Sequence, residues 1–167
     1  MLTRRLVLTG AGLMAANRAF ATSLPVAGGK RLLTISGRIT KPNHDDIAVF
    51  DMPLLESLGL TTIRTATPWF NGPVEFEGVP MTTLMQKVGA DGDRLLVFAL
   101  NDYATEIPMA DFAKYQPILA LKRDGSYMPV ADKGPLFIIY PFDSSAELRN
   151  QKFYSRSAWQ VARMEVI

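Results

Sequence analysis

The sequence predicts one α+β or mainly β domain, a compact mixed β fold with short peripheral helices. Short apolar or alternating segments recur along residues 31–167, which is typical of strands. Turns rich in glycine, proline and aspartate separate these segments, and the helical patterns between them are short. No repeat, linker or low-complexity tract divides the chain. We therefore expect about eight or nine strands and two or three helices in a single domain.

The N-terminus is predicted to be an export signal. Arg4 and Arg5 give a cationic start, and residues 6–16 form an apolar run that is too short to cross a bilayer. Ala-Phe-Ala at residues 19–21 is a typical cleavage site, so residues 1–21 are expected to be a signal peptide and the mature chain to be periplasmic or otherwise exported. The paired arginines also fit the twin-arginine route, while a general secretory signal or a helix packed on the domain remains open.

The net charge and the lack of cysteine limit the kinds of function that the chain can have. Residues 1–21 carry three arginines and no acidic residue, so removing them changes the net charge from +2 to −1. This balance gives no reason to expect a nucleic-acid partner. The sequence has no cysteine, and hence no thiolate for metal binding, redox exchange or nucleophilic attack. No later apolar run is long enough to span a membrane, so the processed chain is not expected to do so.

The first half of the mature chain alternates strands with short helices. Residues 22–30 are expected to be a flexible lead-in. A short helix is predicted from Asp51 to Leu58, because Asp51 can cap it, Pro53 fits its first turn and Gly59 can end it. Strands are predicted at residues 32–39, 48–50, 60–67, 74–77 and 94–100, a second helix at residues 81–88 and a loop at residues 68–73.

The second half of the chain continues this pattern. Asp124-Gly125 between two apolar segments predicts a hairpin. Strands are predicted at residues 118–122, 127–130, 136–140 and 159–166, a short helix from Pro108, and a polar surface loop at residues 142–156. Trp159, at the start of the closing strand, is expected to be buried in the core.

Five segments together carry a resemblance to a known family. They are residues 33–39 (LTISGRI), 69–84 (WFNGPVEFEGVPMTTL), 101–108 (NDYATEIP), 118–136 and 159–166. Their order and spacing, over nearly all of the mature chain, resemble the molybdopterin domain of the sulfite oxidase type. The resemblance implies a compact, mostly β fold with short peripheral helices, and it implies molybdopterin as the cofactor.

The sequence differs from that family at the position of the residue that binds the metal. In the family, a cysteine thiolate just before the tryptophan-glycine segment binds molybdenum, whereas residues 62–67 here are Thr-Ile-Arg-Thr-Ala-Thr. A neutral threonine hydroxyl does not replace a soft thiolate ligand. Phe137 also stands where the family has an arginine, and no glycine directly precedes Tyr103. Sulfite oxidation is therefore not expected.

Other catalytic chemistry has no support in the sequence. The single histidine, His44, lies in a predicted polar loop and is expected to be exposed. No Gly-x-Ser-x-Gly motif indicates a serine nucleophile, and one histidine without cysteine does not make an ordinary zinc site. The aspartates at residues 45–46 and 91–93 are expected to lie in solvated turns. We predict no catalytic residue and no metal ligand.

The first candidate ligand site occupies the place of the family's metal-binding loop. It comprises Thr65, Thr67, Trp69, Phe70 and Asn71. Hydroxyls, an amide and two aromatic rings suit a pocket for a polar organic ligand. The alternative is a core tryptophan beside an ordinary loop.

The second candidate site is Asn101, Asp102 and Tyr103, which end a predicted buried strand where the family faces its cofactor. The alternative there is a turn capped by an aspartate. Ser155 and Arg156 precede the closing strand and can meet a phosphate or carboxylate, although a solvated arginine also fits.

These observations favour an exported ligand-binding or sensory and accessory module without molybdenum redox activity. No cofactor is expected from the residues, whereas the family resemblance implies molybdopterin. The expected partners are a small polar ligand or an exported or membrane-bound protein. The alternative function is a periplasmic molybdopterin-dependent oxidoreductase with non-cysteine metal ligation, and a purely structural subunit is a third.

Overall fold

The computed structural model describes residues 23–167, so the predicted signal peptide lies outside the described residues. Within them, ten strands form two five-stranded sheets, and four short α-helices and three 3-10 turns surround these sheets. The predicted class, α+β or mainly β with short helices, is confirmed at this level. No helix of residues 23–167 is long and apolar enough to cross a bilayer.

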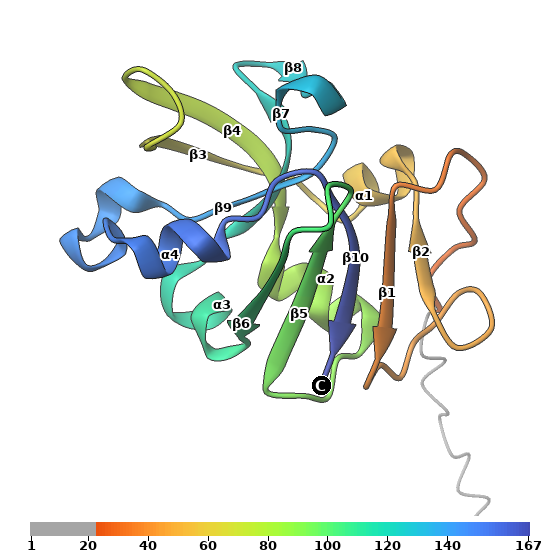
Figure 1. Ribbon diagram of the computed structural model, residues 1–167. Coiled ribbons are helices and arrows are strands. Elements are labelled where there is room, and N and C mark those ends of the chain that lie inside the picture. The colour runs from red at the N-terminus through yellow and green to blue at the C-terminus, as the bar shows by residue number, and fades with distance from the viewer. Residues whose placement is uncertain (1–22) are drawn as a thin grey trace, which may run out of the picture.

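The first sheet joins the two ends of the domain. Its strands are, in spatial order, β2 (Ala48–Phe50), β1 (Leu33–Gly37), β10 (Val161–Val166), β5 (Arg94–Ala99) and β6 (Ala104–Pro108). β1 and β10 pair in parallel, with Thr34 opposite Arg163, and the other neighbours are antiparallel. The last strand of the chain therefore lies between the first strand and β5, as Figure 1 shows.

The second sheet is antiparallel. It contains β3 (Thr61–Ala66), β4 (Pro73–Pro80), β7 (Ile118–Arg123) and β8 (Ser126–Tyr127) in that order, with β9 (Phe137–Ile139) also paired to β7. The register of β4 on β7 shifts between Glu77 and Gly78. A Cβ at Gly78 would lie 2.1 Å from the carbonyl oxygen of Leu119, so only glycine permits this close approach of the two backbones.

Two helices agree closely with their predicted ends. α1 (Met52–Ser57) begins after Asp51, whose Oδ1 accepts a hydrogen bond from the N–H of Leu54 at 2.9 Å, and Gly59 follows with a φ of 94°. α2 (Met81–Val88) ends at Gly89, which adopts the left-handed conformation. The other helical elements are α3 (Ala110–Tyr115), α4 (Gln151–Arg156), η1 (Val130–Asp132), η2 (Phe142–Ser144) and η3 (Ala146–Leu148).

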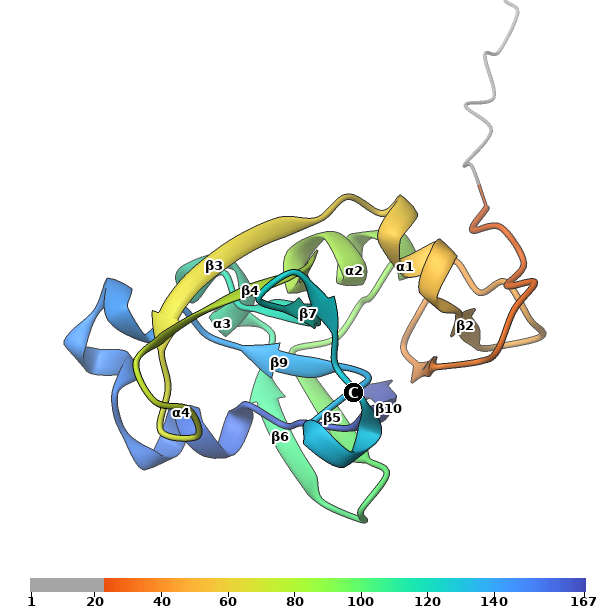
Figure 2. The same ribbon diagram turned by 90° about the horizontal axis from the view of Figure 1, so that it is seen from above.

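The core has two parts. The larger cluster packs the inner faces of both sheets around α2, and it includes Leu33, Leu84 and Tyr140. A smaller cluster surrounds Phe76 and Phe137 in the second sheet. Trp69 packs against both clusters. It lies in the β3–β4 loop, which curves past α4 in Figure 2.

The lead-in segment lies against the domain. Leu24 is buried, the carbonyl oxygen of Pro25 accepts a hydrogen bond from Asn43 Nδ2 at 2.7 Å, and the N–H of Gly29 donates to Asp51 Oδ2 at 2.7 Å. The same aspartate thus caps α1 and fastens the residues that precede β1.

Three expectations are corrected by the structure. Residues 142–156 are not a polar surface loop, because they form η2, η3 and α4 and bury Phe142, Leu148 and Phe153. The strand β6 was not predicted at all. Trp159 is only partly buried and precedes β10, which begins at Val161.

Candidate functional site

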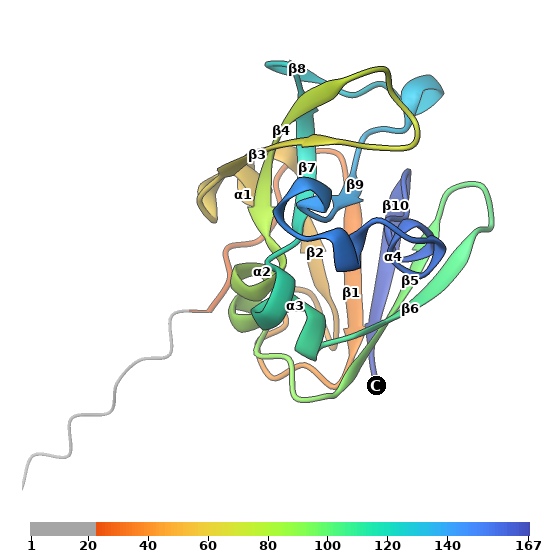
Figure 3. The same ribbon diagram turned by 90° about the vertical axis from the view of Figure 1, so that its left-hand side faces the viewer.

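Both tryptophans of the sequence line one cleft of about 300 Å³, here called the aromatic cleft. Its walls come from the β3–β4 loop, the β5–β6 turn, α4 and the segment before β10. The lining residues are Pro68, Trp69, Asn101, Tyr103, Gln151, Tyr154, Ser155, Ser157 and Trp159. In Figure 3, α4 lies beside β6, which places two of these walls next to each other.

The β3–β4 loop is held at its start by Asp143 of η2. The Oδ2 atom of Asp143 accepts a hydrogen bond from the N–H of Ala66 at 2.7 Å, and its own N–H donates to Thr65 Oγ1 at 3.0 Å. Thr65 is buried, and its hydroxyl also donates to the carbonyl oxygen of Ala66. These bonds fix the direction in which the chain leaves β3 and carries Trp69 toward α4.

Aromatic packing fixes the indole of Trp69. Its ring centroid lies 5.3 Å from that of Phe137, 6.1 Å from Phe142, 6.0 Å from Tyr154 and 5.8 Å from Trp159. The last three contacts are edge-to-face, a favoured geometry for aromatic pairs. Lys133 Nζ lies 3.9 Å from the centroid of Trp159, so one tryptophan of the cleft already carries a cation over its ring.

The β5–β6 turn is tied to α4 by a side chain. Asn101 Oδ1 accepts a hydrogen bond from the N–H of Tyr103 at 3.2 Å, and Asp102 between them has a positive φ of 65°. The hydroxyl of Tyr103 donates to the carbonyl oxygen of Ser155 at 2.7 Å. This bond joins two walls of the aromatic cleft.

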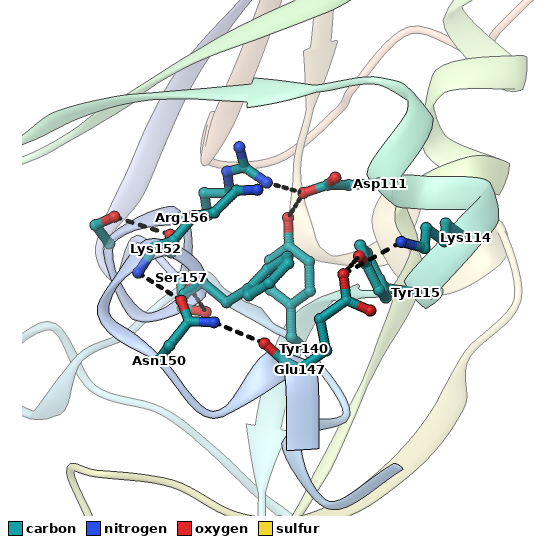
Figure 4. A network of polar contacts seen from close by, with 11 residues as sticks. Asp111, Lys114, Tyr115, Tyr140, Glu147, Asn150, Lys152, Arg156 and Ser157 are labelled. Carbon is teal, nitrogen blue, oxygen red and sulfur yellow. Dashed lines mark hydrogen bonds and ion pairs between the residues drawn. The ribbon is translucent and has the colours of Figure 1, made fainter. Parts of the chain in front are cut away.

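A buried polar cluster holds α4 in place through Arg156 (Figure 4). Arg156 Nη1 lies 2.7 Å from Asp111 Oδ2, and the hydroxyl of Tyr140 donates to the same oxygen at 2.8 Å. The side chains of Asp111 and Arg156 are only 10% and 14% exposed. Burial, and then the carboxylate of Asp111, raises the pKa of Tyr140 far above its ordinary value, so its hydroxyl remains protonated and keeps donating.

Other contacts around α4 fix its neighbouring turns. Asn150 caps α4 by accepting a hydrogen bond from the N–H of Lys152 at 2.9 Å, and its Nδ2 donates to the carbonyl oxygen of Glu147. Glu147 accepts hydrogen bonds from the hydroxyl of Tyr115 and from Lys114 Nζ (Figure 4). The hydrogen bond from Tyr115, then that from Lys114, lowers the pKa of Glu147.

The structure brings together only some of the residues predicted to meet a ligand. Trp69, Asn101, Tyr103 and Ser155 line the aromatic cleft. Asp102 lies between Asn101 and Tyr103 in the sequence, but it lines a different depression, beside Phe98 and Arg163.

The remaining predicted residues lie outside the lining. Thr67 accepts a long hydrogen bond from the N–H of Trp69, and Asn71 is exposed in the β3–β4 loop. Thr65 and Arg156 are engaged by Asp143 and Asp111 within the protein.

Sequence reasoning missed five residues of the cleft. Tyr154, Gln151 and Ser157 belong to the stretch predicted to be a polar loop or its edge, Trp159 was expected in the core, and Pro68 was assigned only to a loop. No local pattern distinguishes these residues, since they meet the two tryptophans only through the packing of α4 on β6.

The lining of the aromatic cleft consists of aromatic rings, amides, hydroxyls and one proline. No Asp, Glu, Lys, Arg or His is among its lining residues. Over residues 23–167, no group of three or more His, Asp or Glu side chains is placed to hold a metal ion. His44 is half exposed beside Asp45, well away in sequence from every lining segment.

A larger groove of about 810 Å³ runs along β3 and α3. It is lined mainly by threonine and serine side chains, together with Lys114 and Tyr115. Both of these are already paired with Glu147, and neither tryptophan reaches the groove. The aromatic cleft is therefore the better candidate for a specific small ligand.

No family model matches this chain, and no curated protein matches it. Function is therefore inferred from the residues and geometry of the aromatic cleft.

Proposed function

We propose that the mature chain is an exported binding or sensory module that holds a small organic ligand in the aromatic cleft, without molybdenum redox turnover. The observation that carries this proposal is the convergence of both tryptophans, two tyrosines and two amides from four chain segments. Trp69 and Trp159 are partly exposed, so these rings are not simply sealed into the core. Concave sites with aromatic walls and a few polar groups are typical of small-molecule binding.

We also propose that the fold is that of the sulfite-oxidase-type molybdopterin domain, kept here for binding. Two stretches support this proposal, because the resemblance assigns both to the cofactor side and they meet in the aromatic cleft. They are the loop with Trp69 and the turn with Asn101 and Tyr103.

The residues of the cleft do not fit the cofactor of that family. Molybdenum there needs a soft anionic protein ligand, and the sequence contains no cysteine. Thr65, which stands nearest to the expected ligand position in sequence, is buried and bonded to Ala66 and Asp143. The phosphate of a pterin cofactor also requires cationic or backbone donors, and no Lys or Arg lines the cleft.

The proposal is tested by identifying what the protein carries. The mature chain is purified from the exported fraction of its native host and denatured, and the released small molecules are identified by mass spectrometry. We expect one organic molecule that is retained by the wild type. The substitution Gln151→Trp fills the cleft and should abolish this retention.

A matched control is available on the same helix. Gln151 and Lys152 are both exposed in α4, but only Gln151 lines the cleft, so Lys152→Trp should retain the molecule. Equal retention by the two variants would show that the molecule binds elsewhere. Release of no organic molecule, together with stoichiometric molybdenum, would favour the alternative oxidoreductase.

A further inference from the structure

We infer that the ligand of the aromatic cleft is a neutral, flat aromatic or heteroaromatic ring that bears an amide-like group, with a carbonyl acceptor and an N–H donor. This inference rests on the proposed function and specifies the class of ligand. The first observation that supports the inference is the lack of charge in the cleft, because none of the nine lining residues is Asp, Glu, Lys, Arg or His. An anion entering the cleft would lose part of its hydration and contact no lining Lys or Arg, which is unfavourable.

A cation is also disfavoured, although aromatic rings often bind cations. No Asp or Glu lines the cleft to balance a cation, and the ring of Trp159 already carries the ammonium of Lys133, which does not itself line the cleft. The buried carboxylate of Asp111, which contacts α4 through Arg156, is bonded to Arg156 and Tyr140 and does not line the cleft.

The hydrogen-bonding groups of the cleft favour a ligand that carries both an acceptor and a donor. A backbone N–H can only donate, so the Oδ1 atom of Asn101 must face Tyr103, and the amide NH₂ is the group of Asn101 that is left for a ligand. The hydroxyls of Tyr103, Ser155 and Ser157 already donate to the carbonyl oxygens of residues 155, 152 and 153, so what they have left is lone pairs that can accept a hydrogen bond from a ligand N–H.

The two indoles add further donors. Within residues 23–167, the indole N–H groups of Trp69 and Trp159 take part in none of the hydrogen bonds found around the cleft. An indole N–H is a donor only. A ring with an amide-like group therefore matches the available groups, because its carbonyl oxygen can accept from Asn101 or an indole and its N–H can donate to a hydroxyl oxygen.

The shape of the cleft limits the ligand to a small ring system. Its volume of about 300 Å³ lies at the low end of ligand pockets, with room for one ring system and its substituent. The walls are aromatic, and a flat ring can lie against them in stacked or edge-to-face contact.

Three probes of nearly identical shape test the inference. Benzamide is neutral and bears a carbonyl, benzoate is an anion and benzamidinium is a cation. The sequence has two tryptophans and both line the cleft, so their indole N–H signals in NMR spectra report on this site alone. We expect benzamide to shift these signals with a Kd at least about tenfold lower than that of either charged probe.

Charge substitutions at one lining residue provide the reciprocal test. Gln151→Lys should raise the affinity for benzoate, and Gln151→Glu should raise the affinity for benzamidinium. Lys152→Glu changes the charge of α4 outside the cleft and should leave the order of the three probes unchanged.

The outcomes separate this inference from the proposed function. Equal or tighter binding of benzoate or benzamidinium to the wild type would overturn the inference and leave the proposed function standing. If no probe shifts either indole signal up to its solubility limit, the inference is overturned, and the molecule released from the native protein decides the proposed function independently.

Discussion

Asn101 holds the β5–β6 turn with one polar atom and offers another to a ligand. Its Oδ1 accepts the hydrogen bond from the N–H of Tyr103, while its amide NH₂ is left at the cleft. Asn101→Asp keeps the acceptor, removes the donor and adds a negative charge. We expect this variant to bind benzamide about tenfold more weakly in NMR titrations, because the carboxylate cannot donate the hydrogen bond that the amide NH₂ of Asn101 donates to the carbonyl oxygen of benzamide.

The fold should not depend on this substitution. The free energy of unfolding of Asn101→Asp, measured in urea, should stay within about 0.5 kcal/mol of wild type because the residue is exposed. Unchanged benzamide binding would show that the amide does not contact the ligand.

The two aromatic residues Phe137 and Trp159 pack against each other but differ in burial. Phe137 is fully buried, whereas Trp159 lies at the cleft and is partly exposed. We therefore predict that Phe137→Ala lowers the free energy of unfolding by about 3–5 kcal/mol and that Trp159→Ala lowers it by clearly less. Denaturant unfolding of both variants checks this order, and an equal loss would place Trp159 in the core after all.

At the scale of elements, α4 depends on the buried pair of Arg156 and Asp111. Arg156→Met would leave the carboxylate of Asp111 largely buried with only the hydroxyl of Tyr140 as a partner. We expect a loss of about 3 kcal/mol in denaturant unfolding, as is typical when one partner of a buried pair is removed. Arg149, exposed just before α4 and outside any ion pair of residues 23–167, provides the control, and Arg149→Met should change little. Equal losses in the two variants would contradict this role.

Asp51 links two elements, and its contribution depends on pH. The hydrogen bond from the N–H of Leu54, then that from Gly29, lowers its pKa in the folded protein. The unfolded chain then binds the proton more tightly than the folded chain. The stability that ionised Asp51 contributes is therefore complete above the unfolded pKa of about 3.9, and it is lost as the pH falls through the lower folded pKa.

Asp51→Asn should flatten this acid dependence. The amide can still cap α1, but it carries no charge to titrate. Urea unfolding over a series of pH values below about 5 measures the slope. Asp46→Asn, in an exposed turn, should retain the wild-type slope, and a wild-type slope in Asp51→Asn would refute the assignment.

The elements that the sequence predicts well are those specified by neighbouring residues. α2 could be placed between Met81 and Val88, because its buried residues follow a helical spacing and Gly89 ends it. β6 could not, since only one of its five residues, Ile107, is buried and the strand ends at a proline. Residues 142–156 were missed because their buried side chains are irregularly spaced and are covered only after α4 packs on β6.

The same distinction applies to the candidate site. Trp69 and Asn101 could be predicted from the residue types beside a strand end, together with the family resemblance. Tyr154 and Ser157 could not, because only tertiary packing brings α4 to the cleft. Thr65 was predicted to contact a ligand because of its hydroxyl, but this hydroxyl accepts a hydrogen bond from the N–H of Asp143. No sequence pattern shows the direction in which the side chain of Thr65 points.

At the scale of the whole molecule, the sequence predicts that the chain is processed and exported. Cell fractionation should find a chain beginning near Thr22 outside the cytoplasm. Replacing Arg4 and Arg5 with lysine should block export only if the twin-arginine route is used. A full-length chain retained in the cytoplasm would contradict the predicted signal.

The central claim is that the aromatic cleft binds an organic ligand without molybdenum redox turnover. The most direct test is the molybdenum content of the mature chain, purified from a host that makes molybdopterin, together with an assay of sulfite oxidation. We predict molybdenum well below one atom per chain and no sulfite-dependent reduction of an acceptor. One molybdenum per chain, with reduction of an acceptor by sulfite or another oxyanion or S-oxide couple, would contradict the account.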